Sequence, residues 1–284
     1  MTEILKLDEA IKKYVKPGEA LALEGFTHLI PNAAGLEIIR QGIKGLTLIR
    51  MTPDLIYDQL IGMGCADKMV FSWGGNPGVG SLHRFREAYE KKIPKTIEIE
   101  EHAHAAMANA YVAGASGLPF AVMDGYKGTS YPEINKNIKT IECPFTGQEL
   151  TAIRALNPDV TIVHAQRADK EGNVWLDGII GVQKEAILAA KKAIVTVEEI
   201  VDHVDEKTGG TVIPNWVIDA VCEVPHGAFP SYASGYYKRN NNFYLSWDAI
   251  SRDYAKFQDW MKEFVLETKD FAEFYKKLEQ ENYA

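Results

Sequence analysis

The segment Ser72-Trp-Gly-Gly-Asn-Pro-Gly-Val-Gly-Ser81 has the composition of a loop that could hold an anion. It follows an apolar run and precedes a predicted helix, and the N–H groups and dipole at a helix N-terminus favour negative charge. No Lys-Ser/Thr pair follows, so it is not a P-loop, and Gly75, Gly78 and Gly80 lack the spacing of the dinucleotide fingerprint. A tight connection without a ligand is an equally good interpretation.

A second glycine turn, Glu24-Gly-Phe-Thr-His-Leu-Ile-Pro31, ends another apolar run. Parallel α/β sheets bind ligands at the carboxyl ends of their strands. Two such turns at one edge would therefore reinforce each other. His28 in this turn could act as an acid, a base or an anion donor, although a lone loop histidine is more often merely solvated.

Acidic and histidine side chains cluster at Glu100-Glu101-His102-Ala-His104. If buried, Glu100 and Glu101 would suit acid–base work, whereas a solvated strand end needs no such role. His102 and His104 would share one face of a strand, but no third ligand lies nearby, so no metal site is predicted. We interpret a second acid pair, Glu198-Glu199, as plain negative charge at a helix N-terminus rather than a nucleophile or base.

Other familiar chemistries find little support in the sequence. The three cysteines, Cys65, Cys143 and Cys222, are far apart and form no CxxC pair, which argues against a disulfide framework and a four-cysteine zinc site. No G-x-S-x-G elbow of a serine hydrolase is present. His164 and Gln166 precede turn residues and could border a site.

Short apolar, β-branched runs alternate with amphipathic segments along the chain, which predicts an α/β fold. Its sheet would be mostly parallel, with helices on both faces. The predicted strands are 20–26, 46–51, 69–73, 97–102, 160–165 and 193–200. The predicted helices are 33–42, 54–62, 81–92, 104–115 and 182–192.

No linker, repeat or shift in composition divides the chain, so we expect one domain over residues 1–284. Its last part, residues 248–284, carries aromatic side chains at three- or four-residue steps and predicts a C-terminal extension of two amphipathic helices. These aromatics are expected to pack on the parent domain, while the alternative is that some meet another protein chain.

Charge and composition restrict the partners. The 284 residues include 31 Lys and Arg against 39 Asp and Glu, a formal charge of −8, which disfavours nucleic acid as the principal partner. The N-terminus has no signal-peptide pattern and no window approaches 18 consecutive apolar residues. We therefore expect a cytoplasmic protein without a membrane partner.

Several segments together resemble the α subunit of class I CoA-transferases, in the glutaconate CoA-transferase branch. The likeness extends over essentially the whole chain, with one departure: Glu24-Gly-Phe26 stands where the wider family often has Gly-Gly-Phe. The segments that carry it are 23–31, 48–54, 71–83, 111–120, 163–166, 195–201 and 231–237.

This resemblance implies an α/β-fold protein that pairs, as the α subunit, with a homologous β subunit in a heterotetramer or a larger assembly. In such enzymes a glutamate of the β subunit forms a thioester with CoA in a ping-pong scheme. CoA esters are substrates, and no cofactor is implied. The present chain has no Ser-Glu-Asn-Gly-type nucleophile segment, so it should be inactive alone.

The resemblance also implies which residues border the substrate. Each tetrahedral intermediate carries an oxyanion that needs preorganised N–H donors, and the two glycine turns are suited to supply donors and walls. The residues expected to bind the substrate or CoA are Gly25, Phe26, Thr27, His28, Gly74, Gly75, Asn76, Gly78 and Gly80.

Three functions stay open at this point. The first is transfer of CoA from succinyl-CoA to a dicarboxylic acid, with 3-oxoadipate preferred and glutaconate as the close variant. The second is hydrolysis or decarboxylation of a CoA ester, as in relatives of this fold, in which case Glu100 or Glu101 would be catalytic. The third is a non-enzymatic sensor. A sensor normally carries an additional effector or DNA-binding module, and the sequence indicates none.

Overall fold

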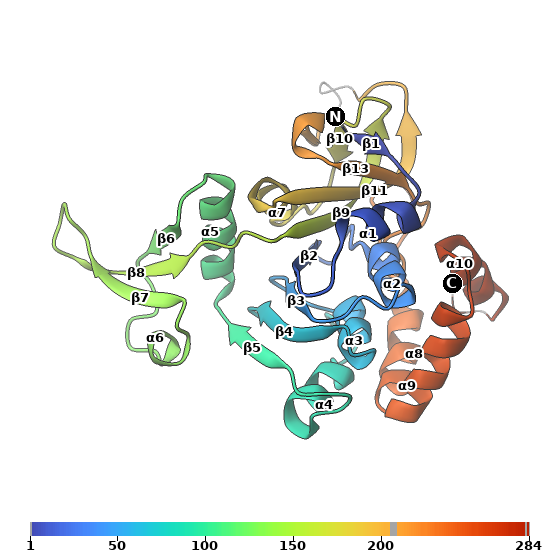
Figure 1. Cartoon of the computed structure of the whole chain (residues 1–284), viewed down its shortest axis with the longest axis horizontal. Helices are drawn as coiled ribbons and strands as arrows, with labels where there is room; N and C mark the ends of the chain where they lie inside the picture. The colour runs from blue at the N-terminus through green and yellow to red at the C-terminus, as the bar shows by residue number, and fades with distance from the viewer. Residues whose placement is uncertain (1, 205–208, 282, 284) are drawn as a thin grey trace.

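A ten-stranded sheet forms the centre of the computed structural model, which describes residues 2–204, 209–281 and 283 (Figure 1). Eight of its strands run parallel to their neighbours, which confirms the predicted mostly parallel sheet. Their order is β1 (Glu3–Ile4), β13 (Ala220–Glu223), β11 (Lys192–Val201), β9 (Val160–Asp169), β2 (Ala20–Glu24), β3 (Leu46–Ile49), β4 (Ala66–Phe71) and β5 (Glu98–Glu101).

An antiparallel extension continues the sheet at β9. There β10 (Val174–Leu176) pairs with both β9 and β12 (Thr211–Ile213), and the short 3-10 helix η2 (Asn215–Val217) follows. The turn from β9 to β10 is built on Asp169, whose carboxylate accepts the N–H groups of Glu171 and Asn173. The turn that the residues after His164 indicate is thus present, between two paired strands.

Helices cover both faces of the sheet, because successive side chains of a buried strand point to opposite sides. In β2, Leu21 and Leu23 belong to the main core cluster, whereas Ala22 belongs to a cluster on the other face. The first face is covered by α1 (Leu7–Tyr14), α2 (Asn32–Arg40) and α3 (Leu55–Gly62), with α4 (His83–Lys91) beside α3. The second is covered by α5 (His104–Ala115) and α7 (Gln183–Ala189) (Figure 1).

The C-terminal segment packs on the parent domain, as predicted, and covers its first face. It begins earlier and is divided more finely than a pair of helices. Its elements are α8 (Asn241–Ser251), α9 (Tyr254–Trp260), the π-helical turn η3 (Met261–Leu266) and α10 (Phe271–Gln280). Asn240, Asp253 and Asp270 each accept a backbone N–H at a helix start, which explains where the helices begin. Trp247 and Phe257 are fully buried in the main core cluster.

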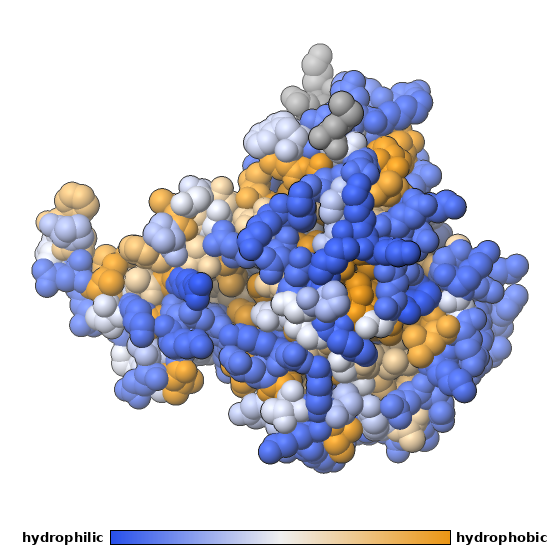
Figure 2. Space-filling view, in the orientation of Figure 1, coloured by the Kyte–Doolittle hydropathy of each residue, from blue (hydrophilic) through white to orange (hydrophobic). Residues whose placement is uncertain are grey.

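A small antiparallel sheet projects from the body of the molecule as an arm, which the sequence patterns did not predict (Figure 1). It consists of β6 (Phe120–Met123), β8 (Glu149–Arg154) and β7 (Ile138–Glu142), together with the one-turn helix α6 (Tyr131–Ile134). Ile153 on its inner face is buried against α5. Figure 2 shows apolar residues at the surface of this arm, where Phe145 is 93% exposed.

Three parallel neighbours, β2, β3 and β4, end at the same edge of the sheet, and the loops that follow them meet the segment after β13. His28 after β2 forms a bridge with Tyr232, and Arg239 donates to the carbonyl of Pro77 after β4. Within the described ranges, none of the helices has the length and hydropathy that crossing a membrane requires.

Candidate active site

The loops at the carboxyl edge of the sheet enclose a narrow crevice. It brings Thr27 of the first predicted glycine turn together with Pro77 of the second, as expected if both turns serve one site. Its lining residues are Thr27, Ile30, Arg50, Thr52, Asp54, Pro77, Arg239 and Tyr244.

The first glycine turn is tightly constrained. A Cβ atom on Gly25 would lie 2.8 Å from the carbonyl oxygen of Leu29, so no side chain fits there. Thr27 and Leu29 adopt positive φ angles of 59° and 51°, conformations that are uncommon for residues other than glycine. The turn is held by the segment after β13, since Ser231 Oγ donates to the Thr27 carbonyl over 2.9 Å.

Arg50 fixes the orientation of the Gly25–Phe26 peptide. Its Nη2 donates to the Gly25 carbonyl over 2.7 Å, and in a trans peptide the following N–H points the opposite way. In the part of the chain that the structure describes, neither the Phe26 N–H nor the Thr27 N–H has an acceptor. These two groups are therefore free to bind a negatively charged oxygen.

Beneath the turn lies a buried group of charges. Arg50 is 1% exposed and its Nη1 is 2.9 Å from Asp54 Oδ1. Glu24, at the position of the departure from Gly-Gly-Phe, accepts from Tyr111 of α5 over 2.9 Å and from the Met51 N–H over 3.3 Å. Burial raises the pKa of Glu24 to about 7. Glu24 thus anchors the turn to α5.

His28 is not exposed to solvent, and its contacts within the protein indicate a structural role. It is fully buried, and its Nε2 accepts the Ser234 N–H over 2.9 Å while its ring packs against Tyr232. Burial lowers the pKa of His28. The neutral ring therefore holds the segment after β13 against the first glycine turn.

The second glycine loop is a short hairpin. Asn76 N–H donates to the Gly80 carbonyl over 3.0 Å, and Gly78 and Gly80 have φ angles of 77° and 138° that favour glycine. Gly74 and Gly75 lead into it, and the Gly75 N–H donates to the Pro53 carbonyl. The Asn76 side chain is buried, and neither its nitrogen nor its oxygen has a partner among the described residues.

The start of the helix that follows this loop is not free to bind an anion, which favours, for this helix, the second of the two interpretations. The N–H groups of Arg84 and Phe85, in the first turn of α4, both donate to Asp58 Oδ1, over 2.8 and 2.9 Å. Asp58 is fully buried, and burial raises its pKa to about 7. A carboxyl group of the protein itself already occupies the helix N-terminus.

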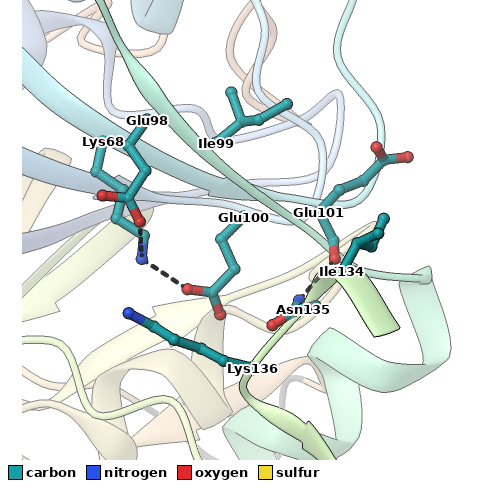
Figure 3. A pocket seen from close by; sticks show the side chains of 8 residues that line it. All are labelled: Lys68, Glu98, Ile99, Glu100, Glu101, Ile134, Asn135 and Lys136. Atoms are coloured by element: carbon teal, nitrogen blue, oxygen red, sulfur yellow. Dashed lines mark hydrogen bonds and ion pairs between the residues drawn. The ribbon is translucent and has the colours of Figure 1, made fainter. Parts of the chain in front are cut away.

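Glu100 lies away from the crevice, in a separate cavity of about 350 Å³ at the edge strand β5 (Figure 3). It is 2.8 Å from Lys68 Nζ and 2.9 Å from His102 Nε2. Burial acts to raise its pKa, but the bonds to His102 and Lys68 prevail and lower the pKa to about 2. A carboxylate ionised so firmly is poorly suited to acid–base work at neutral pH.

Glu101 points away from this ion pair, as expected for the next residue of a strand (Figure 3). Its side chain is exposed and accepts from Tyr131 over 3.0 Å. The two histidines separate as well, since His102 contacts Glu100 and His104 Nδ1 lies 3.1 Å from Ser72 Oγ.

Glu198 lies inside β11 and not at a helix start, so its interpretation as plain charge at a helix N-terminus was wrong. Its Oε1 is 2.6 Å from His164 Nε2 and accepts from Tyr237 over 2.6 Å, while its Oε2 accepts the His226 N–H over 2.7 Å. Burial acts against ionisation, yet the bond to His164 lowers the pKa of Glu198. This network fastens the segment after β13 to the sheet.

Arg50 and Arg239 were also missed. Arg50 directly follows a buried apolar strand at the edge where ligands bind, and that position was a usable signal. Arg239 follows two tyrosines and a lysine in a segment without clear periodicity, so its place in the crevice had no local signal.

Comparisons with known proteins give the family of this chain. Residues 4–224 match the family model described as Coenzyme A transferase. The chain belongs to this family. It is 60% identical over 278 residues to the α subunit of the 3-oxoadipate CoA-transferase of Pseudomonas knackmussii, and the alignment covers 98% of this chain and 99% of that protein.

Solved structures of CoA-transferase relatives share the fold. The glutaconate CoA-transferase of Acidaminococcus fermentans superposes with a TM-score of 0.89 at 33% identity, covering 98% of this chain and 93% of that one. The decarboxylase AibA/AibB matches with a TM-score of 0.80 at 25% identity, covering 92% of this chain and 98% of that one. The resemblance stated from the sequence is confirmed at the level of family and fold.

Proposed function

We propose that this chain is the α subunit of a heteromeric CoA-transferase that moves CoA from succinyl-CoA to 3-oxoadipate. The observation that carries the proposal is the 60% identity, over nearly the full length of both chains, to the α subunit of a 3-oxoadipate CoA-transferase. The free N–H groups of Phe26 and Thr27 and the crevice beside them support it.

In this proposal the covalent chemistry belongs to the partner. A glutamate of a homologous β subunit attacks the carbonyl of succinyl-CoA to give a mixed anhydride and CoA thiolate. The thiolate then attacks the glutamyl carbonyl of this anhydride, which forms the enzyme–CoA thioester and releases succinate. The acceptor acid repeats these steps in reverse. The N–H groups of Phe26 and Thr27 would stabilise the oxyanion of a tetrahedral intermediate.

The second glycine loop, with Gly74, Gly75, Asn76, Gly78 and Gly80, would form a wall of the same site. CoA esters enter as substrates, and the proposal needs no metal or organic cofactor. We place the enzyme in the cytoplasm, as a heterotetramer or a larger assembly of the two kinds of chain.

The proposal is tested by purifying this chain together with the β subunit and measuring CoA transfer from succinyl-CoA by absorbance. We expect kcat/KM to be highest with 3-oxoadipate and lower with glutaconate. A preference for glutaconate would place the chain with its 33% identical relative instead and would contradict the proposed acceptor.

A second candidate is a decarboxylase or hydrolase of CoA esters, favoured by the likeness to AibA/AibB. A complex that hydrolyses or decarboxylates CoA esters without transferring CoA would establish it. Because Glu100 is held in ion pairs, the exposed Glu101 would then be the first carboxylate to mutate.

A further inference from the structure

Arg239 supplies positive charge that the crevice does not neutralise. Arg50 bonds Asp54 with both terminal nitrogens, over 2.9 and 3.4 Å. Arg239 has no ion-pair partner among the described residues. Among the residues that line the crevice, two guanidinium groups thus face the single carboxylate of Asp54.

Contacts with the second glycine loop and with α8 orient the Arg239 side chain. Its Nη1 donates to the Pro77 carbonyl over 3.0 Å, and its guanidinium carbon lies 4.4 Å from the ring centroid of Tyr244. A guanidinium carries five N–H donors, so most remain available after the bond to Pro77. Arginine is the side chain best suited to grip a carboxylate with two parallel bonds.

Arg239 lines two spaces of very different size, the narrow crevice and an open cavity. The crevice has a volume of about 10 Å³, enough for about one oxygen atom, and the hydroxyl-bearing residues Thr27 and Thr52 line it. Arg239 also lines an open cavity of about 640 Å³ beside Tyr232 and Ser234. Arg239 thus borders both a space that fits one carboxylate oxygen and a larger space that fits the rest of a small acid.

We propose that Arg239 binds the carboxylate of the dicarboxylic acid that does not become joined to CoA, and so selects dicarboxylic over monocarboxylic acceptors. The inference rests on the proposed function. That second carboxylate remains ionised at neutral pH, and removing it from water is costly unless a cation and hydroxyl groups replace its hydration. The crevice offers both.

The test compares 3-oxoadipate with 3-oxohexanoate, in which a methyl group replaces the distal carboxylate. Both acids are assayed with succinyl-CoA and the complex, in which this chain is wild-type, Arg239→Ala or Arg239→Lys. Arg86→Ala is the matched control, because this arginine bonds Glu90 on the exposed side of α4. Unchanged thermal unfolding midpoints verify that each variant is folded.

We expect Arg239→Ala to lower kcat/KM for 3-oxoadipate about 10- to 150-fold, the range for a lost hydrogen bond to a charged group. The value for 3-oxohexanoate should stay nearly unchanged, and Arg239→Lys should restore part of the preference. If Arg239 served only to hold the loop at Pro77, its replacement would lower kcat/KM equally for both acids. Equal losses of kcat/KM with the two acids, or no loss with 3-oxoadipate, would overturn the proposal.

A complex that transfers no CoA to any acid would refute the proposed function. In that case, the binding of a dicarboxylate to the complex tests the role of Arg239 separately. Calorimetric titration of the same complex with adipate, a saturated dicarboxylate, should show binding to wild type and loss of it in Arg239→Ala. Equal affinity in both proteins, or no binding to wild type, would overturn the assignment of Arg239.

Discussion

Arg50 joins three parts of the site: the peptide of the first glycine turn, the carboxylate of Asp54 and the wall of the crevice. A buried guanidinium is stable there only because a carboxylate and a carbonyl oxygen accept its N–H groups. Its neighbour Glu24 holds the other side of the turn through Tyr111. In the proposed function, both residues would act on the substrate through the backbone that they orient.

Replacing Arg50 with Lys tests this positioning role. Lysine keeps the charge beside Asp54 but has no planar fork to hold the Gly25 carbonyl at the same time. We expect kcat to fall about 100-fold, the scale for losing one oxyanion donor, with little change in KM. Steady-state kinetics of the complex measure both parameters, and a rise in KM at constant kcat would contradict the role.

Glu24 makes a prediction about stability and pH. Its pKa is about 7 in the folded chain against 4.5 as the ordinary value, so the folded state binds this proton more tightly. The free energy of unfolding should therefore decrease as pH rises from about 4.5 to 7, by roughly 3 kcal/mol from this group.

Glu24→Gln should remove this contribution. Urea unfolding at pH 4.5 and 8 should show that the variant gains stability relative to wild type as pH rises, whereas the exposed Glu279→Gln should not. A stability difference that is independent of pH would show that Glu24 does not titrate in this way.

At the scale of elements, α4 shows why a loop-to-helix pattern is not enough to predict an anion site. The sequence correctly indicated a glycine loop followed by a helix, but Asp58 reaches the helix N-terminus from α3, 26 residues earlier than Arg84. Only the packing of α3 beside α4 reveals that contact. The glycine loop and the helix N-terminus therefore have separate roles.

Asp58→Ala should cost about 2 kcal/mol of stability, because two backbone N–H groups lose their acceptor. Asp253→Ala, which removes a single N-cap bond at the exposed start of α9, should cost about 1 kcal/mol. Denaturant unfolding measures both. KM for succinyl-CoA should stay within about twofold in Asp58→Ala, and a large rise in KM would make this helix N-terminus part of the ligand site.

Other elements show where local patterns sufficed and where they did not. Six of the eight parallel strands and five helices followed from alternating apolar runs, since burial on both faces dictates that pattern, whereas β1, β13 and α1 were not predicted. The arm did not, because β6, β7 and β8 are short strands whose exposed residues mix apolar and charged types. Glu198 lies within the predicted strand 193–200, but its role as plain charge was wrong, because no local pattern shows that His164 and Tyr237 reach its carboxylate.

At the scale of the whole molecule, the crevice opens at the edge of the sheet, and large apolar side chains remain exposed around the loops there. Trp73 is 45% exposed and Ile179 is 50% exposed. Exposed apolar side chains of this size are typical of protein interfaces. Together with the proposed location of the nucleophile on the β subunit, they fit a site completed by the partner.

The central claim, that this chain is one half of a CoA-transferase, is tested most directly by measuring CoA transfer from succinyl-CoA to 3-oxoadipate with three preparations: this chain alone, the β subunit alone, and the co-purified complex. We predict transfer only by the complex. Transfer by this chain alone would contradict the claim that the nucleophile lies on the partner, and a complex that only hydrolyses or decarboxylates CoA esters would contradict the transferase itself.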